Sequence, residues 1–123
     1  MFTVETKSRR LMLLLSLLCI SLFLLGAAQK KFPTGKYARG EFEITFNDDE
    51  THTVSANGKV VVKGSYTVTE DQIVITDKEG DFACPGAGKY KWKVEGTSLK
   101  FEKLEDDCDG RATALSGSTW EKK

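Results

Sequence analysis

The sequence predicts an all-β protein: a small antiparallel up-and-down (meander) β-barrel of about seven or eight strands, preceded by an N-terminal signal helix. Three observations support this prediction. Apolar and polar residues alternate along several short segments, which is typical of strands with one buried and one solvent-exposed face. Short turn motifs separate these segments. The first 28 residues have the composition of a secretory signal peptide.

The N-terminal segment has the three parts of a signal peptide. Basic residues lie within the first ten positions, an uncharged apolar stretch follows over 11–25, and small residues occupy 26–28. We therefore predict cleavage after Ala28, which divides the chain into a signal peptide at 1–28 and a barrel domain at 29–123. The mature protein is then expected to be secreted or periplasmic, with no membrane segment after cleavage.

Two alternatives for this segment remain open. Residues 11–28 form an uncharged run at the short edge of the roughly 20 residues that span a bilayer, so an uncleaved segment would anchor the protein in a membrane. The second alternative is a bacterial lipoprotein acylated at Cys19. Leu17 and Leu18 stand where small residues would precede an acylated cysteine, so we expect Cys19 to be an apolar residue of the signal core.

The charge of the mature chain argues against a nucleic-acid partner. The signal peptide contains one acidic and three basic residues, so the chain from Gln29 onward carries 15 Lys and Arg against 17 Asp and Glu, a net charge of −2. Nucleic-acid-binding proteins cluster a basic excess on one face. We predict no nucleic-acid binding, and the sequence indicates no oligomeric state.

Two cysteines, Cys84 and Cys108, remain after cleavage. An even pair in an exported chain predicts a disulfide. In the chain-entropy model, closing a loop of about 25 residues stabilises a fold by about 3 kcal/mol. That is a large share of the ~5–15 kcal/mol by which domains are usually stable.

The alternation of apolar and polar residues is clearest at 41–46 (EFEITF) and 89–95 (KYKWKVE). It predicts strands near 36–46, 51–56, 59–69, 72–77, 88–95, 98–104 and 117–122. We expect the inward side chains to be those of Tyr37, Phe42, Ile44, Phe46, Val60, Val62, Tyr66, Val68, Ile73, Ile75, Tyr90, Trp92, Val94, Leu99 and Phe101. No helical stripe of useful length appears outside the signal segment.

Turn motifs connect these strands. Asn57-Gly58 is the strongest hairpin signal, because both residues tolerate positive φ. Gly64 lies inside a long strand and predicts a bulge or bend. Because the connections are short, neighbours in sequence are expected to pair. Closing the meander into a barrel buries its apolar face and removes its edges.

Several segments carry a resemblance to a known family. Gly35-Lys36-Tyr37 opens the first strand, in the place of the G-x-W of lipocalins, and further matching segments lie at 64–68 (GSYTV), 71–77 (DQIVITD), 88–92 (GKYKW), 107–111 (DCDGR) and Trp120. On these residues the mature chain resembles the lipocalin-like, or calycin-type, small secreted β-barrels, in particular short exported bacterial domains. In lipocalins a C-terminal arginine packs over the opening tryptophan, so the resemblance implies that Arg111 packs over Tyr37.

The expected barrel interior is the candidate site, because ligand sites are concave and mostly apolar with a few polar groups. We predict that a small apolar or amphipathic molecule binds there, against Tyr37, Phe42, Phe46, Tyr66, Tyr90, Trp92 and Phe101. The alternative is a solidly packed structural or interaction module of the cell envelope, because small barrels often fill their interior with side chains.

The segment 86–89 (GAGK) does not fit a phosphate-binding P-loop. The pattern requires a glycine where Ala83 stands and a Ser or Thr where Tyr90 stands. A strand, without a helix N-terminus, is expected to follow. We interpret the glycines as a turn before that strand.

Metal and enzyme motifs are also incomplete. Residues 106–110 (DDCDG) resemble part of a calcium loop, but Trp120 stands where its bidentate Glu belongs, so a weak calcium site is an alternative to a solvated acidic turn. We predict no metal and no cofactor. His52 is the single histidine, and no G-x-S-x-G nucleophile motif occurs. We predict a protein that is not an enzyme and has no catalytic residues, with a hydrolase or inhibitor acting through a loop as a distant alternative.

Overall fold

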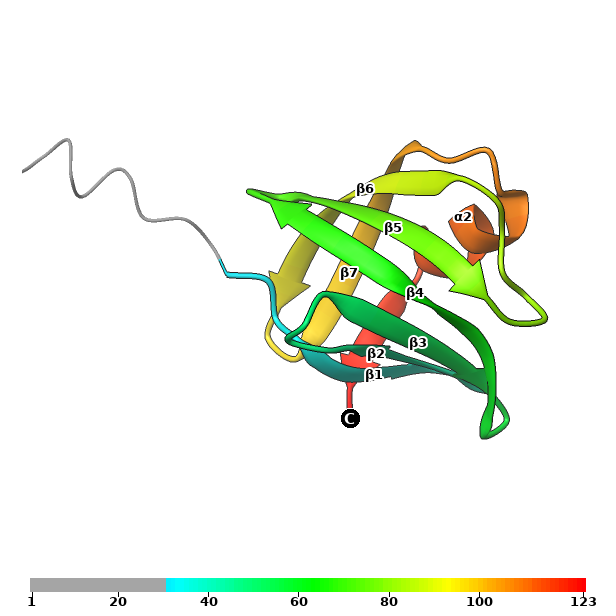
Figure 1. The fold of residues 1–123 in the computed structure, drawn as a ribbon. Coiled ribbons are helices and arrows are strands. Elements are labelled where there is room, and N and C mark those ends of the chain that lie inside the picture. The colour runs from blue at the N-terminus through cyan, green and yellow to red at the C-terminus, as the bar shows by residue number, and fades with distance from the viewer. Residues whose placement is uncertain (1–30) are drawn as a thin grey trace, which may run out of the picture. The chain divides into compact units, whose positions relative to one another are not determined.

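The computed structural model describes residues 31–123, and the predicted signal peptide and its alternatives lie outside the described residues. Within that range, eight antiparallel strands form a closed barrel in which each strand pairs with its neighbours in sequence and the last closes on the first (Figure 1). This confirms the predicted all-β meander barrel. No helix in residues 31–123 is long and apolar enough to cross a membrane.

The strands and the helix follow one another along the chain as β1 (Gly35–Arg39), β2 (Phe42–Phe46), β3 (Thr51–Ala56), β4 (Lys59–Thr69), β5 (Gln72–Glu79), β6 (Ala87–Glu95), β7 (Ser98–Glu105), α2 (Asp109–Leu115) and β8 (Thr119–Lys122). The strand expected over 36–46 is in fact two strands. Gly40 has a φ of 57°, which permits the tight turn between them.

The helix α2 was not predicted from the sequence. Its seven residues make only about two turns, which is too short for apolar residues to recur with the helical spacing that a sequence pattern can reveal. The side chain of Cys108 caps its first turn by accepting a hydrogen bond from the backbone N–H of Arg111, at 3.4 Å. Asp109 in the first turn suits the positive end of the helix dipole.

The turn chemistry of the central hairpin is confirmed. Asn57 and Gly58 have φ values of 51° and 81° and connect β3 to β4. Gly64 lies at a register shift between β4 and β5, as its place in the strand predicted. A Cβ atom there would lie 2.0 Å from the carbonyl oxygen of Thr76, so only glycine permits this close approach of the two backbones.

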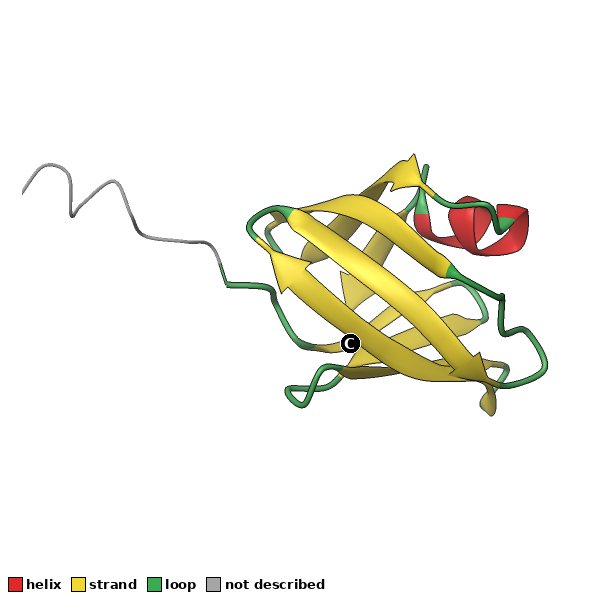
Figure 2. Ribbon diagram, turned by 45° about the horizontal axis from the view of Figure 1, so that its top comes forward, coloured by secondary structure: helices red, strands yellow, loops and turns green. Residues whose placement is uncertain are grey.

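The meander decides which connections meet at each end of the barrel. The segment before β1 and the β2–β3, β4–β5 and β6–β7 turns lie at one end, which we call the aromatic end. The β1–β2, β3–β4 and β5–β6 connections and α2 lie at the other, which we call the helix end. Figure 2 shows α2 beside the barrel, at the end opposite to the one where the described chain begins.

Aromatic side chains fill the aromatic end. Phe32, which precedes β1, packs with its ring centroid 5.0 Å from that of Phe46, 5.6 Å from that of Tyr66 and 5.2 Å from that of Trp92. Such pairs each add about 0.5–1.5 kcal/mol beyond the area they bury. The hydroxyl of Tyr66 donates a hydrogen bond to the carbonyl oxygen of Asn47 at 2.6 Å. This end of the interior is therefore a packed core.

Two residues expected to face inward are exposed. Val60 is 44% exposed and Val94 is 42% exposed. The register of β3 and β4 shifts next to Val54, after which Val61 and Val62 are the buried residues of β4. Val94 stands near the end of β6, where the strand leaves the barrel for its turn to β7.

The contact that the lipocalin resemblance implied for Arg111 is not formed. The cation over the ring of Tyr37 is the ammonium of Lys122, 6.0 Å from the ring centroid. The guanidinium of Arg39 lies 6.0 Å over the ring of Trp120. The strands that close the barrel, β1 and β8, thus exchange two cation–aromatic contacts, and Arg111 has other partners.

The predicted disulfide is present between Cys84, in the β5–β6 loop, and Cys108, at the start of α2, with the Cα atoms 6.1 Å apart. Both segments lie at the helix end. The bond therefore ties α2 to the loop beside it.

We expect the double substitution C84S/C108S to lower the free energy of unfolding by about 3 kcal/mol, because the loop that the bond closes becomes free in the unfolded state. Serine keeps a capping group at position 108. Urea denaturation followed by tryptophan fluorescence measures the change, with the reduced wild type as control. Equal unfolding midpoints for the oxidised wild type and the variant would contradict the prediction.

Candidate functional site

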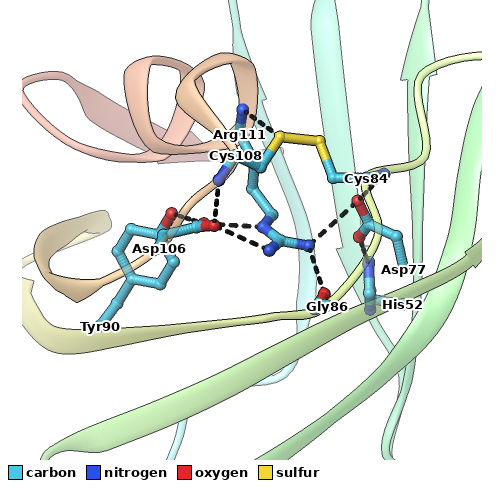
Figure 3. Close-up of a disulfide and its surroundings, with 8 residues drawn as sticks. All are labelled: His52, Asp77, Cys84, Gly86, Tyr90, Asp106, Cys108 and Arg111. Atoms are coloured by element: carbon cyan, nitrogen blue, oxygen red, sulfur yellow. Dashed lines mark hydrogen bonds and ion pairs between the residues drawn. A yellow bond between two sulfur atoms is a disulfide. The ribbon is translucent and has the colours of Figure 1, made fainter.

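A buried ionic cluster lies at the helix end, with Arg111 at its centre (Figure 3). Its Nε and Nη2 donate hydrogen bonds to the two carboxylate oxygens of Asp106, at 2.7 and 2.8 Å. Its Nη1 lies 3.3 Å from a carboxylate oxygen of Asp77 and donates to the carbonyl oxygen of Gly86, also at 3.3 Å. One guanidinium therefore joins two buried carboxylates, one on β5 and one on the residue that follows β7.

Local sequence features bring these side chains together. Asp106 follows β7 directly and lies two residues before the disulfide, and its Oδ1 accepts the backbone N–H of Cys108 at 2.9 Å. A Cβ atom on Gly88 would lie 2.3 Å from Asp106 Oδ2. The glycines of the 86–89 segment thus serve the cluster, since Gly86 provides a carbonyl and Gly88 leaves room for a carboxylate.

Hydrogen bonds fix the charge state of Asp106. Burial by itself would raise its pKa, but the hydrogen bonds from Arg111, Tyr90 and the Cys108 backbone lower the pKa of this carboxyl to about 2. The hydroxyl of Tyr90 donates to Asp106 Oδ2. Burial, together with this hydrogen bond and the neighbouring charge, raises the pKa of Tyr90, which stays a neutral donor.

His52 faces the second carboxylate from β3. Its Nε2 lies 3.4 Å from Asp77 Oδ1, and neither ring nitrogen has a hydrogen-bond partner among the described residues. The side chain is buried, with the residue 1% exposed. A Cβ atom on Gly64 would lie 2.7 Å from the His52 ring, so the bulge glycine makes room for the imidazole.

Asp77 is also held as a carboxylate. Its Oδ2 accepts the backbone N–H of Cys84 at 3.0 Å. Burial would raise its pKa, but the contact with His52, the Cys84 amide and the charge of Arg111 together hold the pKa below its ordinary value. The disulfide loop thus contributes both a covalent tie and a hydrogen-bond donor to the cluster.

A cavity of about 230 Å³ lies beside the cluster. Its polar wall is formed by His52, Asp77 and Arg111. The rest of the wall is mainly apolar and consists of Phe42, Ile44, Val54, Val61, Val62, Ile75, Phe82, Cys84, Gly110, Ala114, Leu115 and Trp120. Phe82 is also 58% exposed, so the cavity reaches the surface next to the β5–β6 loop. An apolar space with a few polar groups on one side is the usual form of a small-molecule site.

The structure brings one of the seven residues predicted for ligand binding to the wall of the cavity. Phe42 lines the cavity. Six others are buried in the core without lining it, namely Tyr37, Phe46, Tyr66, Tyr90, Trp92 and Phe101. The polar residues of the cavity wall were not predicted as site residues. The signal available for His52 was its place on the same face of β3 as Val54, two positions along the strand.

The side chains that line the cavity include no serine, threonine or lysine, and Cys84 is held in the disulfide. Within residues 31–123, no group of three or more His, Cys, Asp or Glu side chains is placed to hold a metal ion. Comparison of the chain with family models, with curated proteins and with solved structures finds no match.

We expect R111M to lower the free energy of unfolding by about 3–5 kcal/mol, because it leaves two carboxylates buried without their cation. Adding D106N to R111M should recover part of this loss, since one of the unpaired charges is then removed. Chemical denaturation measures both variants. K91M, at an exposed position of β6, is the control and should change stability little. A wild-type-like R111M would show that the cluster does not stabilise the fold.

The lowered pKa of Asp106 also predicts how stability depends on pH. A carboxyl with a folded-state pKa of about 2 and an ordinary value of 3.8 contributes about 2 kcal/mol above pH 4. That contribution is lost as the pH falls from about 4 to about 2, and Asp77 acts in the same direction.

Urea midpoints measured between pH 2 and 7 test this, with D106N compared against D107N. Asp107 is exposed, so D107N should keep the wild-type slope, whereas D106N should flatten it. Parallel curves for the two variants would contradict the assignment of the slope to Asp106.

Proposed function

We propose that this protein is an exported, lipocalin-like β-barrel that binds a small apolar or amphipathic molecule in the cavity at its helix end. The observation that carries the proposal is an apolar cavity whose wall includes a buried indole, that of Trp120, with no hydrogen-bond partner. A bound molecule would fill the space and pair with that group.

The size of the cavity supports a small ligand. At about 230 Å³ it exceeds the roughly 150 Å³ of an engineered cavity that binds benzene. It is smaller than the ~300–1,000 Å³ of sites for drug-sized molecules. A single substituted aromatic ring or a short alkyl chain with one polar group fits this range.

The surroundings of α2 support a route for the ligand. An open groove of about 630 Å³ lies against the outer side of the helix and the β1–β2 turn. Phe42, Gly110 and Ala114 line both this groove and the cavity, so the two spaces adjoin at these residues. The guanidinium of Arg39 donates a hydrogen bond to the carbonyl oxygen of Ala114 and holds the helix against the turn.

The proposed location follows from the chain's first residues and its disulfide. Disulfides persist in oxidising compartments, which agrees with a protein secreted or delivered to the periplasm after cleavage of a signal peptide. A membrane-anchored form with an uncleaved N-terminal segment is the alternative. The lipocalin-like assignment is supported by the closed meander of eight strands in residues 31–123 and by Gly35-Lys36-Tyr37 at its start.

A structural or interaction module without a ligand is the second candidate function. The observation that favours it is the packed aromatic end, where Phe32 fills the interior between Phe46, Tyr66 and Trp92. In that case the cavity at the helix end would accept no small molecule. The same experiment therefore separates the two candidates.

We expect ethylbenzene and acetophenone to shift the NMR signal of the Trp120 indole N–H, because Trp120 lines the cavity. The Trp92 indole signal is an internal control and should not move, since Trp92 packs at the aromatic end. A114L should abolish the shift by filling the cavity from α2. K91L places the same side chain at an exposed position of β6, away from the cavity and the groove, and should leave the shift intact. Equal shifts of both indole signals, or none, would favour the module without a ligand.

A further inference from the structure

Resting on the proposed function, we infer that the cavity selects uncharged ligands that carry a hydrogen-bond acceptor, such as a ketone, aldehyde or ester on a small apolar body. The indole N–H of Trp120 supplies the donor. Carboxylates of the same size are rejected. The ligand class thus depends on which polar groups of the cavity wall already have a hydrogen-bond or ion-pair partner in the protein and which have none.

Among the described residues that line the cavity, the donor that faces no acceptor is the indole N–H of Trp120, because His52 Nε2 already lies 3.4 Å from the Asp77 carboxylate. Among the described residues, four buried side-chain nitrogens lack a hydrogen-bond partner. Three of them belong to the cavity-lining residues His52 and Trp120, and the fourth is the indole nitrogen of Trp92 in the aromatic end. His52 is 1% exposed and Trp120 is 2% exposed, so in the protein itself these nitrogens are screened from bulk water. Unpaired buried donors are destabilising, and an acceptor on the ligand removes that penalty.

The charged groups of the wall are not free. All three nitrogens of the Arg111 guanidinium are engaged, two by Asp106 and one by Gly86 and Asp77. A ligand carboxylate would therefore find no cation available to pair with it. Without such a cation, moving an anion from water into an apolar cavity is strongly unfavourable.

The excess of negative charge at the helix end also disfavours a ligand carboxylate. Two carboxylates, those of Asp77 and Asp106, share one guanidinium at this end of the barrel. A third carboxylate beside them would be repelled, because like charges at short range in a low-dielectric site oppose each other's ionisation. An amine has the opposite charge, but it offers only donors in its charged form and cannot satisfy the indole N–H of Trp120.

The test compares four probes built on one phenyl ring: acetophenone, ethylbenzene, benzoate and benzylamine. The protein is exported by a bacterial host, purified as the cell processes it, and titrated at pH 7 with the Trp120 indole signal as readout. We expect acetophenone to bind at least tenfold more tightly than each of the other three. Its binding should shift the Trp120 indole proton downfield, as a new hydrogen bond does. Ethylbenzene should perturb the signal without that downfield shift.

A pair of matched variants assigns the effect to the cavity donor. W120F removes the unpaired indole N–H of a residue that lines the cavity, and W92F removes the unpaired indole N–H at the aromatic end. Methyl signals of Leu115, which also lines the cavity, report binding in both variants. W120F should lower the affinity for acetophenone severalfold and leave that for ethylbenzene nearly unchanged, whereas W92F should change neither. Circular dichroism confirms that each variant is folded.

The outcomes separate the two levels of the proposal. If none of the four probes shifts a cavity signal, the proposed function is wrong and the inference fails with it. If probes bind but ethylbenzene, benzoate or benzylamine equals or exceeds acetophenone in wild-type protein, the proposed function stands and the selectivity inference is overturned. That comparison needs no variant, so a misfolded W120F would not prevent it.

Discussion

The helix end of this barrel depends on one interaction, the pairing of the Arg111 guanidinium with two buried carboxylates. Asp77 on β5 and Asp106 after β7 would each be an uncompensated buried charge without it. Arg111 reaches both because α2 begins directly after Cys108, and Cys108 is fixed by the disulfide to the β5–β6 loop. The helix, the covalent bond and the ion pairs therefore hold one another in place.

This constraint gives the two ends of the barrel different interiors. At the aromatic end, rings of Phe32 and its neighbours interlock and fill the space. At the helix end, the positions of His52 and Asp77 are set by the ion-pair cluster and by the glycines that make room for it. Side chains held in this way cannot move inward to fill the remaining volume. The same contacts that stabilise the end also keep a cavity open beside it.

Much of the fold was predictable because its signals are local. Alternation of apolar and polar residues placed the strands, and Asn57-Gly58 placed the central hairpin. The candidate site was less predictable, because a period of two tells which face of the sheet a side chain takes but not how far along the barrel axis it lies. Trp92 and Phe42 are both inward residues, yet Trp92 packs at the aromatic end and only Phe42 reaches the cavity. Phe32 precedes the first strand and carries no periodic signal at all.

Short-range features of the sequence were enough to predict the strands, most of the turns and the pairing of Cys84 with Cys108. Only the tertiary structure decided what the GAGK segment does. Its sequence lacks the pattern of a phosphate-binding loop. In the closed barrel, the carbonyl of Gly86 accepts a hydrogen bond from Arg111, and Gly88 leaves room for the side chain of Asp106. The physical reason is that a buried charge takes its partners from whichever strands the barrel brings within a few ångströms, and no local pattern records that distance.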